Sequence, residues 1–187
     1  MISFQVVSKW VADQILSGTN LAGVANIVAG APYYDCDNIG NYANTALYAT
    51  LTPIDIINKC NSSYASIDPW LTTNNVVAQT YNLSMAAYEA GTSISEVQAI
   101  YNGADNPSAT VNFIAANRAP PMYEIFKNVL NKYKSANYTQ NAPLMLFSSV
   151  GLPSKYGSWG LLDYMDQVAE TPTHPKFQAV IDFNKGI

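Results

Sequence analysis

Four short apolar runs, separated by longer amphipathic stretches, constrain the fold more than any other feature of this sequence. The runs cover residues 4–7, 25–31, 83–88 and 144–147. They are nearly continuous in apolar residues, which is typical of parallel strands buried on both faces. Strands joined by helical connections form α/β folds. The pattern therefore predicts an α/β chain with a parallel sheet and helices.

The stretches between the runs carry helix signals. Thr52 followed by Pro53 is a good helix start, because threonine caps the first turn and proline fits the first helical position. No linker, repeat or second domain is evident, so residues 1–187 are predicted to form a single domain. Further helical patterns cover residues 10–16, 67–81, 93–102, 108–117, 121–133 and 175–183, with a short element over 161–168.

Composition narrows the classes of function. Only 12% of the 187 residues are charged, and the net charge is −4. Asn, Tyr, Ser and Thr supply most of the polarity, which suits an extracellular protein or one that binds neutral, hydroxyl-rich ligands. No basic run supports nucleic-acid binding. No apolar run approaches the roughly 18 residues of a membrane span, and the first ten residues do not form a signal peptide.

Cysteine and histidine chemistry is sparse. Cys36 and Cys60 are too few for a disulfide framework and lack metal-ligand spacing, so two free buried thiols are expected, with a single disulfide as the alternative. No metal site and no cofactor is predicted. The single histidine, His174, lies in the stretch TPTHP and is expected to be a surface loop residue, which argues against a Ser-His-Asp triad.

Polar and aromatic residues follow each of the last three apolar runs. Functional groups gather at the carboxyl ends of parallel strands, so these side chains are expected to converge on one face. The candidates are Tyr33, Tyr34 and Asp35 after the second run, Glu89 after the third, and Ser148, Tyr156 and Trp159 after the fourth.

Glu89 is the sharpest of these candidates. It ends an apolar strand that has no other charge, and a carboxylate placed there loses hydration, so its position needs a reason. The alternative is a strand-end glutamate that points to solvent or pairs with a lysine or arginine. The aromatic rings offer flat faces for the C–H faces of sugar rings, and ordinary core packing is the alternative for them.

Several long segments resemble the C-terminal part of bacterial secreted glycoside-hydrolase-like proteins, which belong to the cellulase-like clan of (β/α)8 barrels. The resemblance implies a partial TIM barrel in which the four apolar runs are about strands five to eight. It also implies an extracellular location. The segments are AAYEAG (86–91), FIAANRAPPMYEIF (113–126), LFSSVGLPSKYGSWGLLDYMDQ (146–167) and HPKFQAVIDF (174–183), with VVSKWVADQIL and APYYD earlier in the chain.

The resemblance assigns roles to individual residues. In the clan, strand seven ends in the nucleophilic glutamate, and Glu89 matches that position. Tyr33 or Tyr34 matches a tyrosine that hydrogen-bonds the nucleophile. Trp159 is the closest match to an aromatic sugar platform, with Tyr156 second. The family usually reads AYEGG where this chain has Ala90 in place of the first glycine, a change that could alter the turn beyond the nucleophile.

The clan's general acid/base has no counterpart in this chain. It is a glutamate, usually preceded by asparagine, at the end of strand four, and no Asn-Glu dipeptide occurs here. A retaining glycosidase needs two carboxyl groups about 5 Å apart. Asp35 is the only nearby stand-in, with a solvent-facing loop aspartate as the alternative. Three explanations stay open: a fragment of a longer reading frame, which we favour; pairing with a complementary chain or with itself; or an open sheet that has lost catalysis.

The sequence thus predicts a glycoside-hydrolase-like domain whose parent is a retaining glycosidase acting on a β-linked poly- or oligosaccharide. Glu89 would be the nucleophile, and this chain alone would lack the acid/base, so whether it is an enzyme by itself stays open. The alternative is a catalytically inactive carbohydrate-binding or barrel-completing module. The expected partner is a carbohydrate, with no nucleic acid and no membrane, together with self-association or a missing N-terminal half-barrel.

Overall fold

The computed structural model describes residues 3–5, 9–18, 23–34, 45–62, 68–95, 103, 105–138, 142–169 and 174–187. Helices and short parallel strands alternate along these residues, which confirms the predicted α/β class. The chain divides into two compact units. Unit 1 comprises Met1–Tyr33, Ser66–Ala90 and Asn131–Leu146, and unit 2 comprises Tyr34–Ala65, Gly91–Leu130 and Phe147–Ile187. The single-domain assignment of residues 1–187 stays a prediction.

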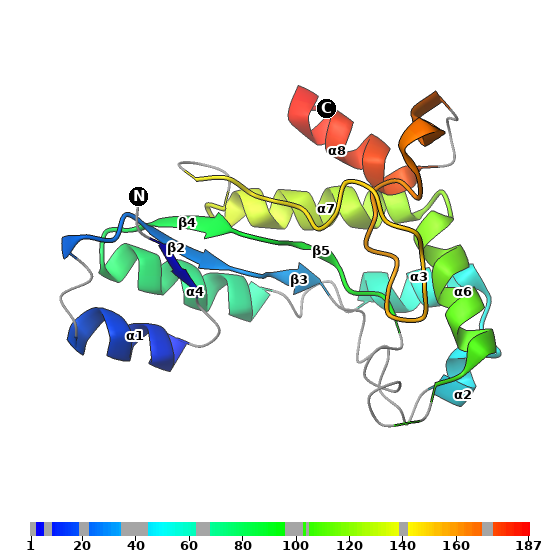
Figure 1. Cartoon of the computed structure of the whole chain (residues 1–187), viewed down its shortest axis with the longest axis horizontal. Helices are drawn as coiled ribbons and strands as arrows, with labels where there is room; N and C mark the ends of the chain where they lie inside the picture. The colour runs from blue at the N-terminus through cyan, green and yellow to red at the C-terminus, as the bar shows by residue number, and fades with distance from the viewer. Residues whose placement is uncertain are drawn as a thin grey trace. The chain divides into compact units, whose positions relative to one another are not determined.

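Unit 1 contains a three-stranded parallel sheet with the strand order β1-β2-β4 (Figure 1). The strands are β1 (Ser3–Gln5), β2 (Ile27–Gly30) and β4 (Ser84–Ala87). Every residue of β2 is buried, which explains why its sequence shows no polar alternation. The first three apolar runs therefore lie side by side and parallel, as predicted.

The fourth apolar run continues this order. Leu144 forms a parallel bridge with Ala87 of β4. The backbone N–H of Ala87 donates to the carbonyl of Pro143 at 3.2 Å, and the N–H of Met145 donates to the carbonyl of Ala87 at 3.0 Å. Neighbours in the sequence are thus neighbours in space across all four runs.

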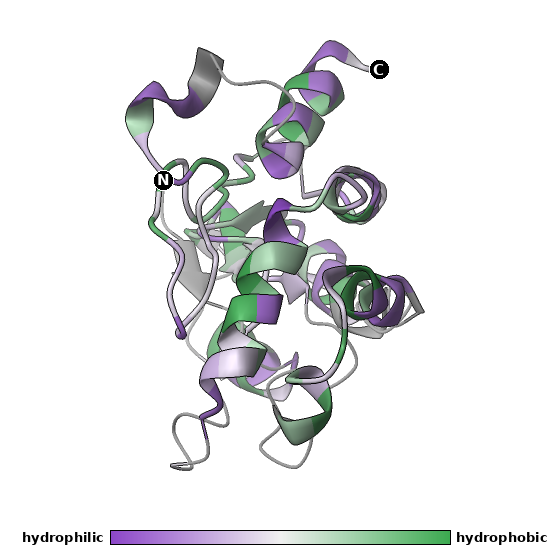
Figure 2. Cartoon of the chain, turned by 90° about the vertical axis from the view of Figure 1, so that its right-hand side faces the viewer, coloured by the Kyte–Doolittle hydropathy of each residue, from purple (hydrophilic) through white to green (hydrophobic). Residues whose placement is uncertain are grey.

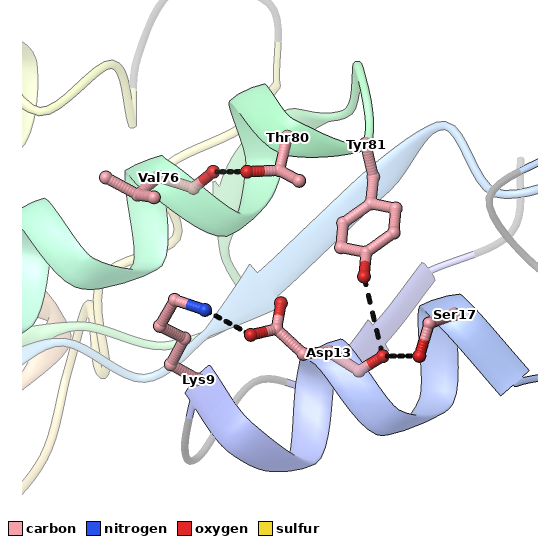
Figure 3. Close-up of polar contacts among 6 residues, drawn as sticks. All are labelled: Lys9, Asp13, Ser17, Val76, Thr80 and Tyr81. Atoms are coloured by element: carbon pink, nitrogen blue, oxygen red, sulfur yellow. Dashed lines mark hydrogen bonds and ion pairs between the residues drawn. The ribbon is translucent and has the colours of Figure 1, made fainter.

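Two helices of unit 1 pack together beside the sheet. They are α1 (Lys9–Gly18) and α4 (Asp68–Thr80), and α4 contacts both α1 and β4. The apolar side chains of α4 that face inward, Leu71 and Val77 among them, are buried. Figure 3 shows the polar contact that joins the two helices, in which the Tyr81 hydroxyl donates to the Asp13 carbonyl at 3.5 Å.

Unit 2 is mostly helical. Phe113 packs its ring against Tyr48 with a centroid distance of 5.2 Å, so α6 contacts α2, and it also contacts α3. Figure 2 shows hydrophobic and hydrophilic residues alternating along the helix ribbons, as expected of helices with one buried face. The helices are α2 (Thr45–Tyr48), α3 (Pro53–Ser62), α6 (Pro107–Arg118), α7 (Met122–Ser135, whose last turn belongs to unit 1), the 3-10 helix η3 (Met165–Ala169) and α8 (Pro175–Lys185).

The helix start predicted at Thr52 is confirmed. The Thr52 N–H and hydroxyl donate to the Asp55 carboxylate at 3.0 and 2.6 Å, and the Asp55 N–H donates back to the Thr52 hydroxyl oxygen at 3.2 Å. This reciprocal pair satisfies backbone donors that the first turn of a helix leaves without partners. These hydrogen bonds hold the pKa of the Asp55 carboxyl below its usual value.

Several expectations need correction. A helix was expected over residues 93–102. Residues 93–95 are not helical, and residues 96–102 lie outside the described residues. A two-stranded sheet pairs β3 (Tyr33–Tyr34) with β5 (Gly91–Thr92), and strands of two residues leave no pattern in a sequence. Cys60 is disulfide-bonded, so the expectation of free thiols is wrong for it. The other cysteine, Cys36, lies outside the described residues.

A doubled-back loop, residues 148–162, follows the fourth apolar run. Its two arms are joined by backbone hydrogen bonds from Gly151 N–H to the Leu162 carbonyl, 2.9 Å, and from Leu161 N–H to the Ser148 carbonyl, 2.9 Å. A Cβ atom on Gly160 would collide with the backbone of Gly151 and Leu162, so only glycine fits where the arms cross. The Phe147–Ser148 peptide bond before the loop is cis.

Candidate functional site

Glu89 lies at the carboxyl edge of the unit 1 sheet. It comes two residues after the end of β4 and is partly buried. The backbone N–H of Tyr88 donates to the carbonyl of Gly30, the last residue of β2, at 3.1 Å. This hydrogen bond holds the segment that carries Glu89 against the carboxyl end of the neighbouring strand, where functional groups of parallel sheets collect.

Tyr33 shares this edge with Glu89. Burial raises the pKa of the Tyr33 hydroxyl above its usual value, and the negative charge of Glu89 and the neighbouring Tyr88 raise it further. The pKa of Tyr88 is also raised, first by burial and then by the charge of Glu89. A phenol in this environment keeps its proton at neutral pH. Two tyrosine hydroxyls can therefore act as donors near the Glu89 carboxylate.

Tyr34 does not share this role. Its side chain is fully buried in unit 2, and its hydroxyl donates to the backbone carbonyl of Cys60 in α3. A side chain without exposed surface cannot stack on a sugar, which corrects the assignment of Tyr34 to substrate binding. Of the two adjacent tyrosines, Tyr33 is the one near Glu89. Asp35, the candidate stand-in for the acid, lies outside the described residues.

The remaining candidates belong to the doubled-back loop of unit 2. Trp159 is partly buried, and its ring meets that of Phe147 edge-on at a centroid distance of 6.1 Å. Gly157 lies against the Trp159 indole so closely that a Cβ atom would collide with the ring. Tyr156 is 51% exposed, with the Lys155 ammonium 5.5 Å from its ring centroid. The Ser148 hydroxyl donates to the Val150 carbonyl at 3.1 Å, so it organises the loop.

The structure thus brings Glu89 together with Tyr33 and Tyr88 in unit 1, and Tyr156 together with Trp159 in the doubled-back loop of unit 2. The predicted convergence of these two groups stays a prediction. Within the part of the chain that the structure describes, no group of three or more His, Cys, Asp or Glu side chains could hold a metal ion. None of the described helices has the length and apolar character needed to span a membrane.

Sequence reasoning missed a buried polar cluster in unit 2. His174, expected at the surface, is only 7% exposed and directly precedes α8. Lys176, in the first turn of α8, is 5% exposed, and its ammonium donates to the backbone carbonyl of Ser158. The sequence shows only that Lys176 is the second residue of an amphipathic helix. Exposed lysines occur at the same position, so this pattern does not predict burial.

Comparison with known proteins assigns no relative: no family model matches the sequence, no curated protein matches it, and no solved structure matches the chain.

Proposed function

We propose that this chain is a glycoside-hydrolase-like domain, equivalent to about strands five to eight of a (β/α)8 barrel, in which Glu89 is the nucleophile of a retaining glycosidase. The observation that carries the proposal is the nearness of Glu89 to Tyr33 at the carboxyl edge of two adjacent parallel strands. A tyrosine that keeps its proton can hold the carboxylate in position for attack on a sugar carbon.

The strand order supports a barrel over other α/β folds. The four apolar runs are spatial neighbours in their sequence order, β1, β2, β4 and then Leu144. In a (β/α)8 barrel each strand lies beside its successor, whereas in a doubly wound sheet the order reverses at a switch point. The disulfide at Cys60 supports an extracellular location, because disulfides persist in oxidising compartments.

The proposed chemistry follows the retaining mechanism. The Glu89 carboxylate attacks the anomeric carbon of a β-linked sugar, the glycosidic bond breaks, and a glycosyl-enzyme ester forms that water then hydrolyses. The leaving oxygen needs a proton from a second carboxyl group, which we assign to a preceding half-barrel in a longer parent or a complementary chain. In unit 2, Trp159 and Tyr156 offer flat aromatic faces of the kind that bind the apolar C–H surfaces of sugars.

An activated substrate tests the nucleophile without the missing acid. A dinitrophenyl 2-deoxy-2-fluoroglycoside has a leaving group that departs without protonation, so Glu89 alone should form a stable ester with it. We expect one member of a panel of β-glycosides to add its sugar mass to the peptide that contains Glu89. Glu89→Gln should abolish the labelling, and Glu124→Gln, an exposed glutamate in the first turn of α7, should not. Failure of the whole panel on folded protein would overturn the proposal.

One observation favours the alternative of an inactive carbohydrate-binding module. Tyr156 exposes half of its side chain on a loop that also holds Trp159. Exposed aromatic rings on a loop whose arms are joined by backbone hydrogen bonds can bind sugars without any catalytic carboxylate. Oligosaccharide binding that is lost in Tyr156→Ala and Trp159→Ala, in a protein that no fluoroglycoside labels, would select this alternative.

A further inference from the structure

A polar pocket of unit 1 lies at the amino end of β4, whereas Glu89 follows the carboxyl end of the same strand. Ser84, the first residue of β4, lines this pocket, and all of its described lining belongs to unit 1. The pocket has a volume of about 230 Å³. One buried water needs only about 10–15 Å³ of such space. The pocket is therefore large enough for a small organic molecule, although it is smaller than the roughly 300–1,000 Å³ of pockets for drug-sized ligands.

Four carboxamide side chains line the pocket. Asn75 and Gln79 are four residues apart in α4, so they lie on the same face of that helix, and Asn82 follows in the turn after it. The fourth carboxamide belongs to Asn137, whose amide nitrogen donates to the amide oxygen of Asn75 at 3.4 Å. The side chain of Asn137 therefore meets the face of α4 that borders the pocket.

Two of these asparagines end helices in the same way. Asn82 follows α4 with φ 54°, and Asn137 follows α7 with φ 67°. In each turn, the N–H of the next residue donates to the carbonyl five positions before it, at 2.8 and 3.0 Å. Glycine is the usual residue at this left-handed position, and asparagine is the less common choice. The turn alone would accept glycine at both positions, whereas a ligand that bonds to the amides requires the asparagines.

The pocket is polar but uncharged. Its described lining contains no charged side chain, and Leu83 and Met85 add apolar surface beside the amides. The residues of unit 1 that lie outside the described part of the chain are also uncharged in the sequence. A charged ligand would give up hydration here without gaining a counterion, so the pocket favours a neutral one.

We propose that this pocket binds a single neutral sugar ring. A sugar hydroxyl both donates and accepts hydrogen bonds, and a carboxamide does the same through its NH₂ group and its carbonyl oxygen. The apolar C–H face of the ring lies against Leu83 and Met85. An apolar ligand of equal size would leave the amides without partners. The inference does not rest on the glycosidase proposal, because the pocket and Glu89 are at opposite ends of β4.

A titration followed by nuclear magnetic resonance tests the proposal on the intact chain. The probes are xylose, glucose, galactose, mannose and N-acetylglucosamine, because the lining does not select among them. A ligand of this size is expected to bind with a Kd on the order of 1 mM, so each probe is added to about 50 mM. For at least one sugar, the side-chain NH₂ signals of the four carboxamides should shift together with a single Kd. Its acid and amine relatives, glucuronate and glucosamine in the case of glucose, should bind about tenfold more weakly.

Two variants separate ligand binding from the role of the turn. Asn82→Gly keeps a residue that adopts positive φ and removes the amide, so Tm should not fall and the affinity for the sugar should fall about fivefold. Gln79→Ala, at an exposed position in the last turn of α4, should weaken binding by a similar factor. Gln14→Ala, at an exposed position of α1 outside the pocket, is the matched control and should bind like the wild type.

Four results would overturn the proposal. They are no shift of the carboxamide signals with any sugar, shifts confined to residues around Glu89 and Tyr33, tighter binding of a charged relative, and wild-type affinity in both Asn82→Gly and Gln79→Ala. The second result would place the sugar at the carboxyl edge of the sheet. Labelling of Glu89 by a fluoroglycoside is independent of all four, so this inference and the glycosidase proposal can fail separately.

Discussion

The two units bury ionisable groups of opposite kinds. In unit 1, burial raises the pKa values of Tyr33, Tyr88 and Tyr138. In unit 2, burial lowers the pKa of Lys176 to about 8. The force is the same in both, because low polarity disfavours the charged form, which is the deprotonated form of tyrosine and the protonated form of lysine. Unit 1 therefore holds tyrosines that keep their protons to higher pH, and unit 2 holds a lysine that loses its proton at lower pH than an exposed lysine.

The stabilities of the two units should respond to pH in opposite directions. A tyrosine whose folded-state pKa is raised contributes stability that is lost as the pH rises above about 10, where the unfolded chain ionises. A lysine whose folded-state pKa is lowered acts in the opposite direction, because between about pH 8 and pH 10.5 only the unfolded chain still binds the proton. Raising the pH should thus stabilise unit 2 before it destabilises unit 1.

The largest expected effect tests whether the two units can be treated separately. Phe113→Ala should cost about 3–5 kcal/mol of unfolding free energy, because it leaves a cavity beside Tyr48 in unit 2. Urea denaturation measures the loss. Val111→Ala, at a 65% exposed position of the same helix, should change it by less than about 0.5 kcal/mol. Hydrogen exchange shows whether the loss stays in unit 2. If Phe113→Ala accelerates exchange in β2 and β4 of unit 1 as much as in unit 2, the two units unfold together as one cooperative structure.

The next largest effect isolates the lysine. Between pH 8 and pH 10.5 the unfolding free energy of the wild type should gain about 3 kcal/mol relative to Lys176→Met, because the variant has no proton to lose at this position. Denaturation curves at several pH values measure the difference. Parallel pH profiles for the two proteins would show that Lys176 titrates alike in the folded and unfolded chain, and the contrast between the units would fail.

A smaller effect isolates one tyrosine of unit 1. Tyr138 is fully buried, and burial raises its pKa, so above about pH 10 it should cost the wild type about 1.4 kcal/mol per pH unit. Tyr138→Phe should remove this contribution and leave the profile below pH 10 unchanged. Thermal unfolding from pH 9 to pH 11 is the measurement. An alkaline loss as steep in Tyr138→Phe as in the wild type would refute the prediction.

The smallest effect should not depend on pH. The Asn106 side-chain oxygen accepts from the backbone N–H groups of Ser108 and Ala109 at 3.1 and 3.5 Å, which caps α6. Asn106→Ala should cost about 1 kcal/mol, and Asn106→Asp should retain most of the cap. Because the cap involves no titrating group, the loss in Asn106→Ala should be equal at pH 7 and pH 9.5. A loss that varies with pH would show that α6 responds to a charge outside its cap.

The strands and several helices were predictable because the signals are local. Buried parallel strands read as continuous apolar runs, and Thr52-Pro53 marks a helix start in two residues. The placement of Glu89 beside Tyr33 was also predictable, because both follow neighbouring strands. Which of two adjacent tyrosines faces inward was not, since successive side chains of a strand point to opposite sides and the sequence does not fix the phase.

The buried cluster of unit 2 was not predictable for a different reason. Lys176 is buried by contacts with Ser158 and with the region around Asp163 and Arg118, which lie far away along the chain. The same holds for the disulfide of Cys60, which forms only if the fold brings the second cysteine of the chain within bonding distance. Whether a charged or reactive side chain is buried depends on residues that are distant in the sequence, so a local sequence pattern does not predict it.

The crossing at Gly160 limits how the doubled-back loop can evolve. Every substitution there puts a side chain into backbone atoms, so a point mutation at the crossing should force the two arms of the loop apart. The tip at residues 154–157 turns back through Ser154 and Gly157, and the aromatic ring at Tyr156 projects from it into solvent. Substitutions at the tip should therefore be tolerated far better than substitutions at the crossing.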